Sequence, residues 1–132
     1  DISYDIQLNE YEKFLRYLDK ISEKIKIVFI STSSKKDNWY TQFKKKSEEK
    51  VLLQSKNNLV VRLPCVVGKG VFVGFRNRTI SPYGVVNFLT IEECVDFIIN
   101  SRDKSGIVQA DGWNISAETL CELVNFFQDV RE

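Results

Sequence analysis

Apolar residues recur along this chain with two different spacings, and segments of the two kinds alternate. Residues 6–24 carry apolar side chains three and four positions apart, which is typical of a helix with one buried face. Residues 26–31 and 59–63 are short runs rich in β-branched side chains, typical of buried strands. Helical spacing returns in later segments, at 38–54, at 91–101 and after Ser116. Strands that alternate with helices predict a three-layer α/β fold, in which helices flank a parallel sheet.

Polar residues mark the points where several of these helices begin. Asp37 or Asn38 is placed to cap the second helix, because Asp and Asn side chains accept hydrogen bonds from the N–H groups of a first turn. Thr90, with Glu93 three residues later, has the spacing of a capping box. Ser116 stands in the same position before the last helix. We therefore expect helices to start directly after these caps.

Composition and charge fit a compact domain with one moderate core. Of the 132 residues, 43% are hydrophobic and 28% are charged, and the formal net charge is +1. The lysine runs are followed by glutamates, which predicts a mixed-charge helix face rather than a nucleic-acid site. No apolar run reaches the ~18 to 20 residues that cross a bilayer, and no signal peptide precedes the first helix. We expect neither nucleic acid nor a membrane as partner.

Cysteine and histidine usage narrows the possible chemistry. The cysteines are Cys65, Cys94 and Cys121, each among apolar residues, and their odd number favours reduced thiols in a cytoplasmic protein. The sequence has no histidine, which excludes a Cys/His zinc site and catalysis by Ser-His or Cys-His pairs. We expect no metal, and acid/base chemistry must fall to Tyr, Lys, Asp or Glu.

The candidate chemistry lies where the first strand passes into the second helix. The strand ends in the hydroxyl run Ser31 to Ser34, at the carboxyl edge where open α/β sheets bind ligands. On the next helix Tyr40, Lys44 and Glu48 recur every four residues, so the phenol and the ammonium share one face. Together with a hydroxyl they form a proton-transfer constellation, because an ammonium stabilises a phenolate. The alternative interpretation is a solvated helix face with i,i+4 contacts.

The order of these features resembles the extended short-chain dehydrogenase/reductase family, which includes nucleotide-sugar epimerases, dehydratases and reductases. The matching features are the strand, the Ser/Thr cluster, the Tyr-x-x-x-Lys-x-x-x-Glu spacing, and the strand 59–63 that closes at Gly68. Residues 87–93 are similar to the family's entry into a late helix, and residues 106–118 to its late strand and the following helix. The resemblance implies a fold like the C-terminal half of a Rossmann-type dinucleotide-binding domain.

The resemblance also implies catalytic roles. Tyr40 matches the acid/base, and Lys44 matches the residue that holds the nicotinamide ribose and lowers the tyrosine pKa. Thr32 matches the hydroxyl that hydrogen-bonds the substrate, and Ser33 is the alternative match for the same hydroxyl. Asn9, near the start of the first helix, stands where the family has an active-site Asn.

Cofactor and substrate follow from the same resemblance. It implies NAD or NADP, contacted by Ser31, Tyr40 and Lys44, and a nucleotide sugar as substrate. Substrate contacts are expected at the position where the family's Arg-x-x-Asn-x-x-Gly pattern has its Asn, and from two arginines, because planar guanidinium groups bind phosphate bidentately. A solvated loop is the alternative for the arginines. These candidate substrate residues are Cys65, Arg76 and Arg78.

The chain lacks the family's cofactor-binding turn, and the start of the chain gives a second observation. Family members open with a Gly-x-x-Gly-x-x-Gly turn that holds the cofactor pyrophosphate, and none of the six glycines here, all from Gly68 onward, has that spacing. The chain also begins at Asp1 and contains no methionine. We therefore expect residues 1–132 to form a single α/β domain, part of a longer chain whose cofactor-binding half precedes it.

Several hypotheses about function stay open. The first is an NAD(P)-dependent epimerase, dehydratase or reductase of nucleotide sugars; the second is a degenerate, non-catalytic relative that acts as a binding or dimerisation module. In a third, Tyr40 and Lys44 are only a surface pair on an unrelated α/β domain. The resemblance implies a homodimer through the helices near 6–24 and 38–54, and the alternative is that their aromatic side chains fill only the core of one chain.

Overall fold

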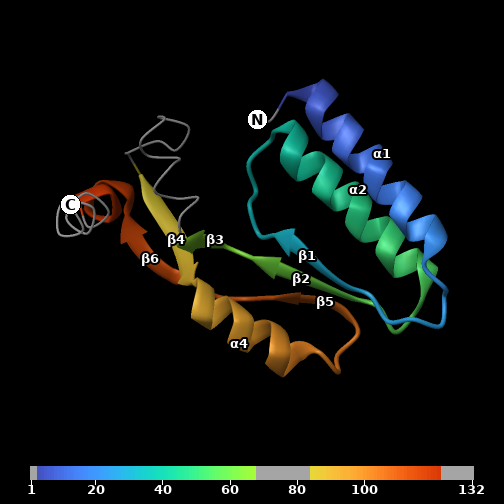
Figure 1. The fold of residues 1–132 in the computed structure, drawn as a ribbon. Coiled ribbons are helices and arrows are strands. Elements are labelled where there is room, and N and C mark those ends of the chain that lie inside the picture. Colours follow the sequence, from blue (N-terminus) through green and yellow to red (C-terminus); the bar gives the residue numbers. More distant parts are fainter. Residues whose placement is uncertain (1–2, 68–83, 123–132) are drawn as a thin grey trace, which may run out of the picture. The chain divides into compact units, whose positions relative to one another are not determined.

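The computed structural model describes residues 3–67 and 84–122 (Figure 1). Their contacts divide the chain into two compact units. The first unit holds residues up to Leu63 together with 97–110, and the second holds 64–96 together with the residues from Asp111 onward. None of the helices in the described ranges is long and apolar enough to span a membrane.

The first unit is a parallel sheet covered by two helices. Its elements, in chain order, are α1 (Tyr4–Lys20), β1 (Val28–Thr32), α2 (Trp39–Gln54), β2 (Leu59–Leu63) and β5 (Gly106–Gln109). The strand order is β1-β2-β5, and both strand pairs are parallel. Helix α2 packs on β1 and β2, while α1 packs alongside α2 (Figure 1). The predicted α/β class, with helices flanking a parallel sheet, is confirmed.

The core of this unit lies between the two helices and the central strand. Leu18 of α1, Val51 of α2 and Val60 of β2 are buried together, and half-buried apolar side chains pack around them. Both neighbours of Val60 on β2 are fully buried as well. A strand that is buried on both faces is predominantly apolar, which explains why residues 59–63, apolar except for Arg62, were recognisable from the sequence.

Asn58 connects the C-terminal end of α2 with the N-terminal ends of β1 and β2. Its side chain is fully buried, and Oδ1 accepts from the Ile27 amide at 2.7 Å while Nδ2 donates to the Val51 carbonyl at 2.9 Å. Both polar ends of the amide are therefore satisfied, as a buried polar side chain requires. Asn58 therefore makes a specific buried contact between the end of the helix and the sheet.

The second unit contains a separate small sheet. Its strands are β3 (Cys65–Val67), β4 (Val85–Thr90) and β6 (Trp113–Ser116), in the order β3-β4-β6. β3 and β4 are parallel, but β4 and β6 are antiparallel. Helix α4 (Ile91–Ser101) follows β4 directly and passes into the first unit at Phe97. The sequence did not predict β6, because this strand has four residues and only one of them is not exposed.

The predicted caps are confirmed where the structure describes them. Asn38 caps α2, and its Oδ1 accepts from the Thr41 amide at 2.9 Å. Thr90 and Glu93 form the expected capping box of α4, since the Glu93 amide donates to Thr90 Oγ1 and the Thr90 amide donates to Glu93 Oε1, each at 3.2 Å. Ser116 Oγ accepts from the Thr119 amide at 3.1 Å. The helix caps could therefore be predicted from the sequence without knowledge of the fold.

Candidate functional site

The carboxyl end of β1 and the first turns of α2 carry the candidate site. β1 ends at Thr32, and α2 starts at Trp39 after a short connection. On α2, Lys44 and Glu48 both reach back to β1: Lys44 Nζ lies 3.5 Å from the Ile30 carbonyl oxygen, and Glu48 accepts from the Ser31 hydroxyl. The face of α2 that carries the four-residue repeat therefore points at this strand.

Tyr40 and Lys44 are neighbours on that face. The Lys44 ammonium lies 5.7 Å from the centroid of the Tyr40 ring and 5.0 Å from the centroid of the Phe29 ring. Tyr40 is 37% exposed, so its phenol is accessible at the surface of the unit. The phenol and the ammonium thus lie together as the spacing predicted.

The pKa of Tyr40 shifts in the direction opposite to the one that the resemblance implied. Burial raises the pKa of Tyr40, whereas the resemblance implied that Lys44 lowers it. The physical reason is that the partly buried phenolate would lose hydration. In this structure the phenol is therefore the favoured form of Tyr40.

Lys44 experiences two opposing effects. Burial lowers the pKa of its ammonium, because a charged group is less stable away from water, and the Glu48 carboxylate raises that pKa. Burial is the larger of the two effects. The protonation of Lys44 is consequently set by its surroundings, as is typical of lysines in functional sites.

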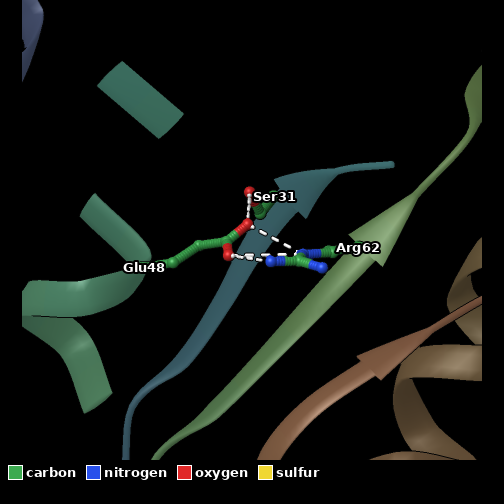
Figure 2. A network of polar contacts seen from close by, with 3 residues as sticks. All are labelled: Ser31, Glu48 and Arg62. Atoms are coloured by element: carbon green, nitrogen blue, oxygen red, sulfur yellow. Dashed lines mark hydrogen bonds and ion pairs between the residues drawn. The ribbon is translucent and has the colours of Figure 1, made fainter. Parts of the chain in front are cut away.

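Glu48 is the centre of a buried polar network (Figure 2). Its Oε1 accepts from Arg62 Nη2 at 2.7 Å, Arg62 Nε lies 3.2 Å from both carboxylate oxygens, and Oε2 accepts from Ser31 Oγ at 2.5 Å. The Glu48 side chain is 5% exposed and that of Arg62 is 31% exposed. The network joins α2, β1 and β2 through three side chains.

The spacing along α2 predicts the helix face of Glu48, but it predicts no role for Arg62. The available signal was an arginine within the apolar strand Leu59–Leu63, since a charged residue in a buried strand normally has a charged partner. The partner itself was not predictable from spacing, because Glu48 and Arg62 are 14 residues apart and meet only through the packing of α2 on β2.

β1 has a free edge beside Lys44. It is the end strand of its sheet, and no other strand within residues 3–67 and 84–122 pairs with it on that side. The Ile27 carbonyl and the Ser33 amide bond to β2, and backbone groups alternate in direction along a strand, so those of Ile30 face away from β2. This free edge is where Lys44 Nζ contacts the Ile30 carbonyl oxygen.

An open cavity of about 190 Å³ lies between α1, α2 and β1. Lys44 lines it together with aromatic rings and a few polar side chains. The lining residues are Gln7, Glu10, Tyr11 and Phe14 of α1, Phe29 of β1, and Phe43, Lys44 and Ser47 of α2. The cavity therefore adjoins both the lysine and the strand whose edge is free.

The remaining candidates lie in different places. Thr32 ends β1, and its Oγ1 accepts from the Ser34 amide at 3.0 Å; Ser33 extends the pairing with β2 through its amide. Asn9 is exposed on α1 and does not line the cavity. Cys65 begins β3 in the second unit. The two candidate arginines, Arg76 and Arg78, lie outside the described residues.

Comparisons with known proteins give a structural similarity only. No protein-family model matches the chain, and no curated protein matches it in sequence. Among solved structures it is similar to the Bordetella bronchiseptica enzyme WbmG, determined in complex with NAD, with a TM-score of 0.60 and 11% sequence identity. The match covers 89% of this chain and 47% of that enzyme's chain. The two proteins share a fold, and this chain spans just under half the length of its structural neighbour.

Proposed function

We propose that this chain carries the tyrosine and lysine of an NAD(P)-dependent enzyme that acts on a nucleotide sugar as epimerase, dehydratase or reductase. The observation that carries the proposal is the pairing of Tyr40 and Lys44 beside the end of β1, with Thr32 as the last residue of that strand. The NAD bound in the structural neighbour WbmG supports a nicotinamide dinucleotide as cofactor. The sequence motif supports the substrate class.

In this proposal each side chain has a distinct task. Lys44 donates to the hydroxyls of the nicotinamide ribose, and Tyr40 exchanges a proton with the sugar hydroxyl or carbonyl under reaction. Because burial favours the phenol form of Tyr40, this residue is ready to donate a proton before any ligand arrives. The Thr32 hydroxyl hydrogen-bonds the same substrate oxygen. The nicotinamide supplies the hydride chemistry when it is bound.

The described residues supply only part of a dinucleotide site. The cavity next to Lys44, about 190 Å³, is smaller than the ~300 to 1,000 Å³ usual for ligand pockets. A ribose-sized group suits it better than a whole dinucleotide. We propose that the rest of the cofactor is held by a further polypeptide segment.

The free edge of β1 is where we propose that this further segment pairs. Parallel sheets are normally covered and continued, yet Val28 and Ile30 of this strand are 36% and 39% exposed. An added parallel strand would bond the outward backbone groups of β1 and extend the sheet beside these side chains. The neighbour's greater chain length supports the same arrangement.

We also propose a homodimer through α1 and α2. Their surfaces expose large apolar side chains, with Tyr17 of α1 69% and Leu53 of α2 81% exposed. Large exposed apolar side chains on packed helices support a protein interface in this proposal. In this proposal α1 and α2 form the contact between subunits, and the proposed catalytic residues lie at the end of β1.

Binding of NADH to the complete protein, including the further segment that we propose, tests the role of Lys44. Replacing Lys44 by methionine removes the ammonium but keeps an unbranched side chain, and we expect the dissociation constant to rise about tenfold or more, the value of one lost charged hydrogen bond. Lys45→Met is the matched control, because Lys45 is its neighbour on α2 and is exposed. Equal affinities for the two variants, or no NADH binding by the unmodified protein, would contradict the proposal.

A further inference from the structure

The buried Glu48 carboxylate and the Lys44 ammonium meet β1 at adjacent positions. Glu48 follows Lys44 by one helical turn on α2, so both side chains project from the same face. Lys44 Nζ contacts the carbonyl oxygen of Ile30, and Glu48 Oε2 accepts from the hydroxyl of the next residue, Ser31. The anion is buried in the unit, while the cation lies at the free edge of the strand.

We propose that Glu48 is a positioning residue, which keeps the Lys44 ammonium charged and fixed at the free edge of β1. The inference deepens the proposed function and rests on it for the role of Lys44 toward a cofactor. Arg62 and Ser31 fix the carboxylate by donating to both of its oxygens. Because the carboxylate cannot turn away to solvent, its field acts on Lys44 from a constant place.

The other titratable groups that face Lys44 do not provide a comparable fixed anion. Glu10 lines the same cavity from α1, but its side chain is 64% exposed and lies 3.6 Å from the Lys13 ammonium. Tyr11, also from α1, and Tyr40 on α2 are phenols. β1 faces Lys44 with the Phe29 ring and the Ile30 carbonyl, which do not titrate. Glu48 is the buried carboxylate of this set.

The same network has a simpler explanation as a pure anchor between α2 and the sheet. An anchor would affect Lys44 only by disturbing the packing around it. The two explanations differ in how Lys44 responds to charge: a positioning carboxylate acts through its charge, whereas an anchor acts through its shape and hydrogen bonds.

An NMR pH titration of the Lys44 side chain, in the protein without cofactor, separates them. We expect Glu48→Gln to lower the pKa of Lys44, because it removes the anion but keeps the shape. Glu48→Asp, which keeps the charge but shortens the side chain, should leave the pKa closer to that of the unmodified protein. Glu49→Gln is the matched control: it makes the same charge change at the next, exposed position and should leave Lys44 unchanged.

Glu48→Gln in an Arg62→Gln background provides a second test. Arg62→Gln alone removes a cation and should raise the pKa of Lys44 whatever Glu48 does, whereas the added Glu48→Gln should lower that pKa only if the carboxylate acts on Lys44 through its charge. This comparison holds even if Glu48→Gln alone fails to fold, because the double variant contains no unpaired buried charge. The proposal is overturned if Glu48→Gln leaves the pKa of Lys44 unchanged, if Glu48→Asp and Glu48→Gln shift it equally, or if the added Glu48→Gln does not lower it in the Arg62→Gln background. A larger effect of Glu10→Gln than of Glu48→Gln would also overturn it.

The titration needs neither cofactor nor substrate. Its failure would therefore remove the positioning role of Glu48 and leave the proposed function standing. Conversely, if NADH does not bind while Lys44 responds to Glu48 as expected, the electrostatic coupling stands and the cofactor assignment is wrong.

Discussion

Replacing Tyr40 by phenylalanine is expected to lower turnover of a nucleotide sugar about 10²-fold or more, the usual contribution of a general acid/base. The substitution removes one hydroxyl and keeps the ring that lies beside the Lys44 ammonium. Cofactor affinity and thermal stability should therefore change little. Steady-state kinetics with NADH affinity measured in parallel would show whether the loss falls on the chemical step.

Tyr17→Phe is the matched control for this experiment. Tyr17 lies on α1 and is 69% exposed, and Tyr17→Phe keeps the apolar ring that we propose for the dimer contact, so turnover should stay unchanged. If Tyr40→Phe retains turnover within about threefold of the unmodified enzyme, Tyr40 is not the general acid/base, since such a loss is far below that range.

The acid/base role of Tyr40 also implies a direction of pH dependence. Because burial raises its pKa, the phenol is protonated at neutral pH in the cofactor-free protein. A step in which Tyr40 takes up a proton should therefore become faster as the pH rises, and a step in which it donates should not. The alkaline rise should be absent in Tyr40→Phe.

Replacing Arg62 by methionine should lower the free energy of unfolding by about 2 to 4 kcal/mol, because it leaves the buried Glu48 carboxylate without its cation. This range extends below the ~3 to 5 kcal/mol that is usual for a broken buried pair, since the Arg62 side chain is 31% exposed and partly hydrated. Urea denaturation followed by circular dichroism measures the change directly.

The control for Arg62→Met is Arg16→Met, at an exposed position of α1, which should change stability by less than about 0.5 kcal/mol. The double variant Glu48→Gln/Arg62→Met should recover part of the loss, because it no longer contains an uncompensated buried charge. Equal stabilities of the Arg62 and Arg16 variants would show that the network does not hold α2 on the sheet.

Features that depend on neighbouring residues were predictable from the sequence. The boundaries of β2 follow from its continuous apolar run, and the caps at Asn38, Thr90 and Ser116 follow from side chains that bond to amides within the next turn. The repeat on α2 likewise placed Tyr40 and Lys44 on one face. In each case the cause lies within a few residues of the effect.

Features that depend on packing between distant segments were not predictable. The pairing of Glu48 with Arg62 requires the register of β1 on β2 together with the position of α2. The strand β6 acquires its conformation from pairing with β4, because its own residues show little apolar alternation. The pKa of Tyr40 depends on how deeply the ring is buried, which spacing along a helix does not specify.

The most direct test of the account is conversion of a nucleotide sugar by the complete purified protein, including the further segment that we propose holds the rest of the cofactor. The protein would be incubated with NAD or NADP and with UDP-glucose, UDP-N-acetylglucosamine, GDP-mannose or dTDP-glucose, and the sugar nucleotides would be separated by chromatography. The account predicts that at least one of them is converted, only in the presence of a nicotinamide dinucleotide, and that Tyr40→Phe abolishes the conversion. Conversion that is equal with Tyr40→Phe, or an absence of both conversion and NADH binding, would contradict it.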